Sequence, residues 1–247
     1  MERAKYLLIP LFLLYFVSLG DNKNKVYNAY VRNRMDEWKK IIDSLDKVSN
    51  KSNQLILELV NYQYGFIAWC LSNDKKKMAE KYLKKAINYI NKLESEKFKL
   101  SEVYSYKSAF IGFEIAINPW KAPFIGSNSI EFAKYAISLD SLNYLAFIQL
   151  GNAEYYRPKI LGGSREKALK YYIKALQIME KNLGEIKNDW NYINLLTTIG
   201  KIYLELSDYE NSRLYFEKVL KIEPNFLWVK NELYPELLNK MRRGGYE

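Results

Sequence analysis

Three small residues in front of a predicted helix have the types and spacing best suited to binding chemistry. Gly162, Gly163 and Ser164 precede a helical pattern that begins near residue 165. Backbone amides at such a helix start can hold an anion, so a phosphate or carboxylate site is one interpretation. The other is a turn that ends in a helix cap, because glycine permits tight turns and serine caps helices. The turn is the interpretation that we prefer.

Catalytic chemistry has few candidate groups in this sequence. The chain has no histidine and a single cysteine, Cys70, which follows Trp69 in an apolar stretch and is expected to be buried. Ser-His-Asp triads, Cys-His pairs and histidine-ligated metals are therefore excluded, as is an intramolecular disulfide. Glu94 and Glu96 lie in a charged stretch typical of a solvated surface. We predict a protein that is not an enzyme, with no catalytic residue, no cofactor and no metal.

The charge of the chain could indicate a nucleic-acid-binding surface, since the 247 residues carry a formal charge of +10. The lysines are spread along nearly every predicted helix, however, and alternate with glutamate and aspartate. This pattern is typical of a solvated helical surface, so we predict no nucleic-acid partner.

Residues 1–20 have the three-part pattern of an export signal. Basic residues precede an apolar run at 6–17, and Ser18 and Gly20 supply the small residues of a cleavage site. The run is short for a membrane span, although an uncleaved N-terminal anchor is the alternative. We expect a mature chain that starts near Asp21, has no stable transmembrane span and lies in the periplasm or cell envelope of a bacterium. A chain with one cysteine is ordinary there.

The clearest structural pattern is a pair of helices near the C-terminal end. Apolar and small residues at helical spacing predict one helix after residue 194 and a second that ends at Pro224. Ser207 and Glu210 fit a capping box that starts the second helix. The pair resembles a tetratricopeptide repeat (TPR), whose signature positions hold Leu196, Gly200, Tyr203, Ser212, Phe216, Val219 and Pro224. The resemblance implies an all-α fold, a right-handed α-solenoid of stacked helical hairpins.

Weaker copies of the pattern cover most of the chain beyond residue 25. We predict about four TPR-like hairpins within 58–224, a leading degenerate hairpin or cap at 21–57, and a C-terminal capping helix and tail at 225–247. The hairpins are expected at 58–100, 101–143, 144–187 and 193–224. Each contains one repeat glycine that should let its helices approach closely: Gly65, Gly112, Gly151 and Gly200.

Two hairpins carry extra residues between their helices. The repeat glycine and the next signature residue are 12 apart in the last hairpin but 17 apart in the second and third. We predict enlarged loops around Pro119 and Pro158, which should lie next to each other on one edge of the solenoid. The second loop also resembles a Pro-x-x-x-Gly-Gly loop common in exported bacterial TPR proteins, through Pro158, Leu161, Gly162, Gly163 and Ala168.

The first helix of each hairpin is expected to face a concave groove with mostly aromatic and aliphatic side chains. The predicted partner-binding residues are Tyr62, Phe66, Trp69, Tyr106, Phe113, Ile148, Asn152, Tyr155, Tyr156 and Lys201. Two interpretations stay open: an accessible apolar wall, or ordinary core covered by the leading and end helices. Side chains at the loop edge would add stacking and cationic contacts, namely Trp120, Lys121, Arg157 and Lys159.

Glu154 does not fit this pattern, because it occupies the position that Tyr203 holds in the last repeat. Either the helix is rotated so that Tyr155 packs instead, or a buried carboxylate needs a cationic partner. The enlarged loop nearby favours rotation.

These features predict a non-enzymatic protein-binding scaffold of the bacterial cell envelope, which holds a protein partner in the groove or at the loop edge. The alternative is a solute-binding accessory protein that encloses a small apolar ligand in the groove. An open, solvated groove would favour the first function and a closed cavity the second.

Overall fold

The computed structural model describes residues 21–244, whose regular structure is helical with no strand. The predicted export signal at 1–20 and the last three residues lie outside the described residues. No helix between residues 21 and 244 is long and apolar enough to cross a membrane.

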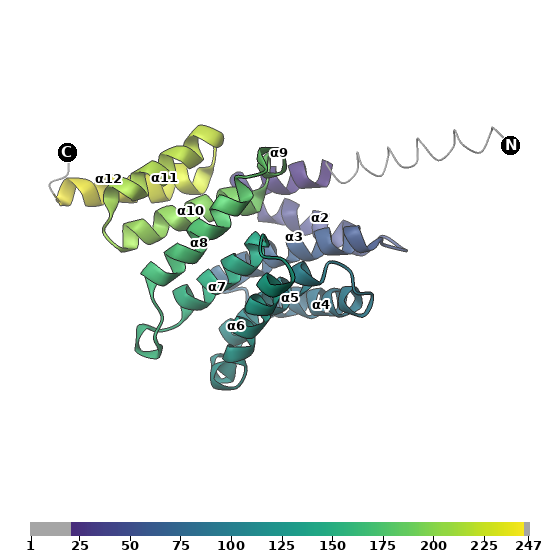
Figure 1. Cartoon of the computed structure of the whole chain (residues 1–247). Helices are drawn as coiled ribbons and strands as arrows, with labels where there is room; N and C mark the ends of the chain where they lie inside the picture. The colour runs from purple at the N-terminus through teal and green to yellow at the C-terminus, as the bar shows by residue number, and fades with distance from the viewer. Residues whose placement is uncertain (1–20, 245–247) are drawn as a thin grey trace.

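Four helical hairpins make up most of the molecule (Figure 1). They pair α3 (Asn53–Ser72) with α4 (Lys76–Ser95), α5 (Leu100–Ile117) with α6 (Ala122–Leu139), α7 (Tyr144–Tyr156) with α8 (Arg165–Met179), and α10 (Trp190–Glu205) with α11 (Tyr209–Ile222). Each hairpin packs on the next, and the short helix α9 (Leu183–Ile186) precedes the fourth. The chain is an all-α solenoid of helical hairpins, as the sequence predicts.

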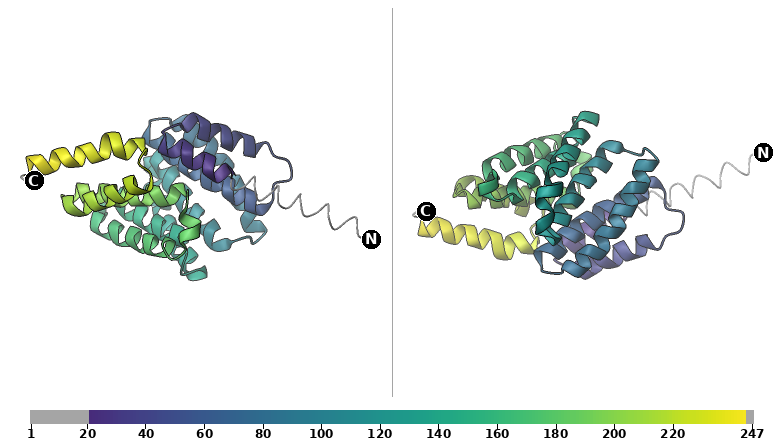
Figure 2. Two further views of the ribbon diagram at one scale, coloured as in Figure 1. Left: turned by 90° about the horizontal axis from the view of Figure 1, so that it is seen from above. Right: turned by 90° about the horizontal axis from the view of Figure 1, so that it is seen from below.

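Further helices cover both ends of this array. A helix over residues 21–31 and α2 (Met35–Asp46) precede the first hairpin, and a π-helical turn, η3 (Val229–Leu233), leads into α12 (Tyr234–Arg243). Figure 2 shows α12 projecting from the array, and the purple 21–31 helix between the first and last hairpins.

The helix at 21–31 connects the two ends of the core. Val26 and Ala29 pack in one apolar cluster with α3 and α4, whereas Tyr27 and Val31 pack in a second with α8, α10 and α11. The stacked hairpins therefore do not form an open superhelix, because the leading helix fills the space between the first and the last.

Two of the four repeat glycines, Gly151 and Gly200, sit where the helices of their own hairpin approach closely, as predicted: a Cβ atom added to either would lie 2.6 Å from an aromatic ring of the paired helix. Gly65 differs, because a Cβ there would lie 2.7 Å from the Trp190 ring of α10 and 2.8 Å from Trp38 of α2, and not against its paired helix α4. These distances are shorter than carbon atoms tolerate, so a side chain there would force the helices apart.

The prediction for Gly112 is wrong. Within residues 21–244, no atom of another part of the chain lies within 4 Å of a Cβ added there. Helices α5 and α6 approach at serines instead: Ser129 Oγ donates to the Ser108 carbonyl at 2.9 Å, and Ser101 Oγ to the Ala136 carbonyl at 2.8 Å. Small hydroxyl side chains that bond to the facing backbone take the place of glycine in this hairpin.

The enlarged loop predicted around Pro119 is also absent. A 3₁₀ turn, η1 (Pro119–Lys121), runs directly into α6 at Ala122, so the extra residues lengthen the helix. The segment 157–164 does form a loop, around the 3₁₀ turn η2 (Lys159–Leu161). Both turns lie at the lower side of the array in Figure 1, which agrees with the predicted shared edge.

Polar side chains start several of the helices. Ser164 Oγ accepts the Lys167 amide at the start of α8, and Asp208 Oδ1 accepts the Asn211 amide at the start of α11. The predicted cap at Ser207 is therefore displaced by one residue, because Ser207 adopts a left-handed conformation with φ of 60°. Asp208 is the better cap of the two, since its negative carboxylate is also stabilised by the positive end of the helix dipole.

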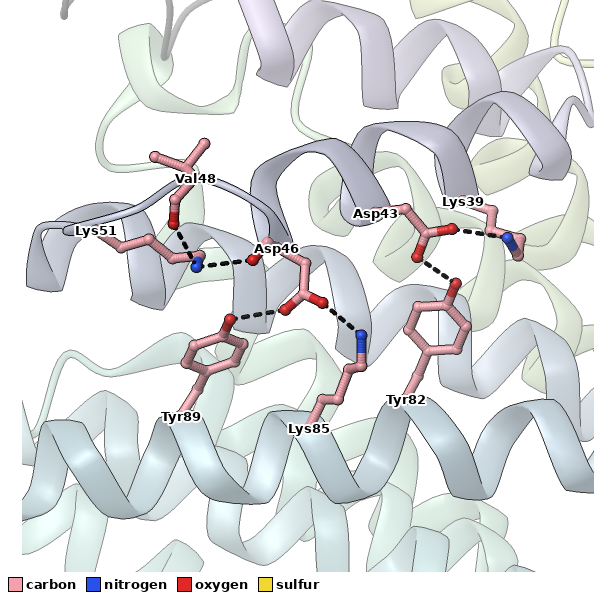
Figure 3. Close-up of polar contacts among 8 residues, drawn as sticks. All are labelled: Lys39, Asp43, Asp46, Val48, Lys51, Tyr82, Lys85 and Tyr89. Atoms are coloured by element: carbon pink, nitrogen blue, oxygen red, sulfur yellow. Dashed lines mark hydrogen bonds and ion pairs between the residues drawn. The ribbon is translucent and has the colours of Figure 1, made fainter.

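A polar seam fastens α2 to α4 (Figure 3). Tyr82 donates to Asp43 at 2.6 Å, Tyr89 donates to Asp46 at 2.7 Å, and Lys85 forms an ion pair with Asp46. Burial raises the pKa of both carboxyl groups, but the hydrogen bonds and charges of their lysine and tyrosine partners outweigh it. The pKa of each therefore lies below the ordinary value of 3.8.

Because of this seam, we expect the free energy of unfolding to fall at acidic pH, and we expect Asp46→Asn to make that fall smaller. Because the folded-state pKa is lowered, the seam stabilises fully above about pH 4 and loses its contribution as the pH falls through the lowered value. We expect Asp46→Asn to lower the free energy of unfolding by about 1 kcal/mol at neutral pH, with a smaller difference near pH 2. Urea denaturation across this pH range measures it. Glu80→Gln on α4 is the control, and an equal effect of both substitutions would contradict the prediction.

Candidate functional site

Much of the predicted groove wall is core. Tyr62, Phe66, Tyr106 and Ile148 are buried, and the first three belong to the apolar cluster shared by α3, α4 and α5. The aromatic stripe can be interpreted either as an accessible apolar wall or as ordinary core, and the burial of these four side chains fits the second interpretation. No partner can reach them without rearrangement of the helices.

Tyr64 of α3 fills the middle of the groove. Its ring stacks on Phe113 at 5.5 Å between centroids and contacts Trp190 at 6.0 Å. Its hydroxyl accepts hydrogen bonds from Gln149 and from Asn152, the latter at 3.5 Å. Phe113 and Asn152 are thus near the predicted surface, but Tyr64 occupies the space that a ligand would need.

The ends of the chain cover the last part of the groove. Tyr30 from the 21–31 helix donates to Asn194 Oδ1 at 2.7 Å, and its ring contacts Phe226 at 5.2 Å. Trp228 lies against Lys201, with the ammonium 5.2 Å from the ring centroid. Helices at both ends therefore occupy positions that a bound peptide would take in an open array.

The early groove residue Trp69 is half-buried and already has contacts of its own. Its ring stacks on Phe66 at 5.6 Å, and the Lys75 ammonium lies 4.2 Å from its centroid. The neighbouring Cys70 is fully buried, as expected, and burial raises the pKa of its thiol to about 11 although Lys75 opposes this. A thiol that is buried and protonated at neutral pH is not a nucleophile.

The turns of the second and third hairpins, in contrast, expose large apolar side chains. The exposed fractions are 69% for Trp120, 76% for Tyr156, 92% for Ile160 and 65% for Leu161. Lys159 is exposed beside them. We call these five residues the turn edge. It includes the predicted Trp120, Tyr156 and Lys159, whereas sequence analysis did not select Ile160 and Leu161 as binding residues. Two adjacent aliphatic residues outside any helical stripe were the signal that could have revealed them.

The remaining loop-edge cations are held by carboxylates. Lys121 donates to Glu114 at 3.1 Å, and Arg157 lies 3.5 Å from Glu154. The second contact gives Glu154 the cationic partner that one of the two interpretations required. Both groups can orient the turn, but neither is as free to reach a partner as Lys159.

Tyr155 fastens the third hairpin to the fourth. Its hydroxyl donates to Glu205 Oε1 at 2.5 Å, and its ring lies under Arg165, whose guanidinium carbon is 4.5 Å from the centroid. Arg165 in turn pairs with Glu205 at 3.0 Å. The predicted groove residue Tyr155 is therefore half-buried in an inter-hairpin contact, which fixes the position of its exposed neighbour Tyr156.

The Gly162-Gly163-Ser164 segment has the geometry of a capped turn. Gly162 has a φ of 86°, and a Cβ on Gly163 would lie 1.9 Å from the Arg157 carbonyl oxygen. The first glycine is needed for its conformation and the second for lack of space, while Ser164 caps α8. These roles account for all three residues without an anion.

Two clefts in the described chain are lined by residues outside the turn edge. One cleft of about 380 Å³ is lined by residues of the 21–31 helix, the α9 segment, α10 and α11, including Tyr27, Asp189 and Tyr192. Burial raises the pKa of Asp189, although Lys23 and the Asn191 amide oppose it. Within residues 21–244 there is no group of three acidic or cysteine side chains that could hold a metal ion.

Comparisons with known proteins agree with the repeat. Residues 193–226 match the tetratricopeptide repeat family model. The HusA haemophore from Porphyromonas gingivalis is similar in structure, with a TM-score of 0.60 and 17% identity over 75% of this chain and 93% of that chain. BtubC (BKLC) from P. vanneervenii gives a TM-score of 0.42 and 15% identity over 79% of this chain and 74% of that chain. No curated protein matches the sequence.

The fourth hairpin therefore carries a tetratricopeptide repeat, within an array of helical hairpins in the described part of the chain. At such low identity, the likeness to HusA concerns the fold.

Proposed function

We propose that this chain is a non-enzymatic protein-binding scaffold of the bacterial cell envelope that holds its partner at the turn edge. The observation that carries the proposal is the exposure of Trp120, Tyr156, Ile160 and Leu161 at the turns of two consecutive hairpins. Soluble proteins seldom leave large apolar side chains together on the surface unless another molecule covers them. TPR arrays suit this role because stacked hairpins hold their turns in fixed positions.

The turn edge defines the chemistry of the partner. Burial of Ile160 and Leu161 would contribute about 1.5–3 kcal/mol each, so an apolar partner segment provides most of the affinity. Lys159 lies beside them and favours a segment that also carries a carboxylate. The predicted residues Lys121 and Arg157 would act indirectly, through the contacts with Glu114 and Glu154 that hold the two turns.

The test is a double substitution at the turn edge. We expect Ile160→Asp with Leu161→Asp to weaken partner binding by about a hundredfold, because charged groups would enter an apolar contact. The partner is first crosslinked to the wild-type chain in its own envelope, identified, and then titrated by calorimetry. Leu214→Asp on α11, where the leucine is 61% exposed, is the matched control. A partner that binds the double variant as tightly as the control would refute the proposal.

A small apolar ligand is the second candidate function. The cleft lined by Tyr27 and Tyr192 and the fold shared with a haemophore favour it. Titration with haem, followed by absorption spectroscopy, separates the two candidates. A saturable one-to-one band shift that the turn-edge double variant retains would favour ligand binding in the cleft over the scaffold.

Export of the chain is part of this proposal. It is supported by the pattern of residues 1–20 and the fold shared with a haemophore. N-terminal sequencing of the protein recovered from a periplasmic or envelope fraction tests it, with a start near Asp21 as the expected result.

A further inference from the structure

Helix α6 has an unusually apolar outer face. In the described structure this 18-residue helix buries only Ala133 and Ala136. Its other side exposes Phe124 by 73%, Tyr135 by 47% and Leu139 by 43%, and Leu142, just after the helix, by 55%. These four residues, with Glu131 and Lys134 between them, form what we call the α6 face. Water-exposed apolar side chains along one helix are what a second helix would cover.

The charge of α6 also sets it apart from the second helices of the first and third hairpins. The segment of α6 contains one glutamate and one lysine, Glu131 and Lys134. By contrast, α4 contains six lysines and two glutamates, and α8 four cations and one glutamate. Two copies of a chain with a formal charge of +10 repel one another over most of their surface. The α6 face is a place where they can approach without that repulsion.

We infer that the α6 face binds a second copy of this chain, with the two α6 helices antiparallel about a two-fold axis. This interaction goes beyond the proposed function, since the α6 face shares no residue with the turn edge, although the ring of Phe124 lies 6.4 Å from that of Trp120. A two-fold contact uses the same surface on both copies, so that surface must be complementary to itself. The residues of the α6 face meet this requirement in charge.

The charges pair across the axis. When the axis passes between residues 132 and 133, Glu131 of each copy lies opposite Lys134 of the other. The contact then contains two ion pairs and no like-charge contact. Exposed ion pairs contribute little to affinity, but they select the register and orientation of the helices.

The apolar residues meet in the same register. Leu142 and Leu139 of one copy lie near the start of α6 in the other, where Phe124 is exposed. Tyr135 lies close to the axis, and its ring is already held edge-on against Tyr104, with centroids 4.6 Å apart. A ring fixed in this way loses little freedom on binding, which favours association.

Charge reversal tests this pairing. In sedimentation equilibrium of the full chain, Glu131→Lys and Lys134→Glu alone should each weaken the dimer by about tenfold, because each places like charges opposite one another. The double variant Glu131→Lys, Lys134→Glu should restore the wild-type dissociation constant, since the two changed charges attract again across the axis. Both positions are exposed, so helicity by circular dichroism should not change.

Apolar substitutions provide a second measurement. Leu139→Asp should weaken the dimer by about a hundredfold, and Leu214→Asp on α11, outside the α6 face, should leave it unchanged. A chain that stays monomeric up to about 100 μM would overturn the inference, since an apolar helix pair of this size should associate below that concentration. A dimer that the double charge reversal fails to restore would overturn it too. Partner binding at the turn edge does not depend on the dimer, so either of these two results would leave the proposed function standing.

Discussion

Replacing Trp190 with alanine is expected to lower the free energy of unfolding by about 3–5 kcal/mol, the range for truncation of a buried aromatic residue. Trp190 is buried at the start of α10, and its ring contacts Trp38 at 5.1 Å between centroids. Its indole nitrogen donates to Asn61 Oδ1 at 2.8 Å. The ring also lies against Gly65, whose missing side chain provides its space. The substitution would leave a cavity and remove the shorter of the two hydrogen bonds that the half-buried Asn61 Oδ1 accepts.

The effect should extend beyond stability, because Trp190 joins the last hairpin to the first. In an open solenoid each repeat contacts only its neighbours, and distant hairpins are independent. Here we expect the variant to unfold in two transitions where the wild type unfolds in one, as urea denaturation followed by circular dichroism would show. Trp120→Ala is the control, since that ring is 69% exposed and its loss should change stability by less than about 0.5 kcal/mol. Equal effects of the two substitutions would contradict the closed arrangement.

Replacing Gly200 with alanine should destabilise the fourth hairpin by about 1–3 kcal/mol, the range for overpacking a core. The new Cβ atom would lie 2.6 Å from a ring carbon of Phe216 and 3.3 Å from the Tyr215 Cβ. Phe216 is fully buried, so its ring cannot move aside without displacing its neighbours. Thermal and urea denaturation measure the loss.

Gly112→Ala is the matched control, and it should change the free energy of unfolding in the opposite direction. Gly112 lies within a helix and is exposed, with open space around it in the described structure. Alanine should therefore stabilise the chain by about 0.5–1 kcal/mol, because it restricts the unfolded chain and favours helix. Destabilisation by both substitutions would show that α5 and α6 approach at Gly112 after all.

The filled groove changes where a partner can bind. Tyr30, Tyr64 and Trp228 of the chain itself occupy the inward side of the array. Large apolar side chains that remain in contact with water include those at the turns and on the outer side of α6. Both proposed contacts therefore use the outside of the array, in contrast to the concave groove that the sequence predicts.

The sequence by itself determined the helices and their pairing. Apolar periodicity, together with helix-ending residues such as Pro224, is local information, because a helix forms from residues close in sequence. The repeat signature of the fourth hairpin follows from the same local pattern, and it predicted the contact of Gly200 with the paired helix correctly. Burial of Cys70 could also be predicted, since it depends only on the apolar face of one helix.

Only the tertiary structure decided which faces are covered. The sequence of α5 is as compatible with a helix crossing at Gly112 as with one at Ser108, and the packing of α6 selects the second. An inward aromatic stripe predicts a groove wall or a core equally well, because both are apolar. Tyr30 determines the outcome, through contacts with residues more than a hundred positions away. Such contacts depend on how distant helices meet in space, and no local pattern in the chain encodes that.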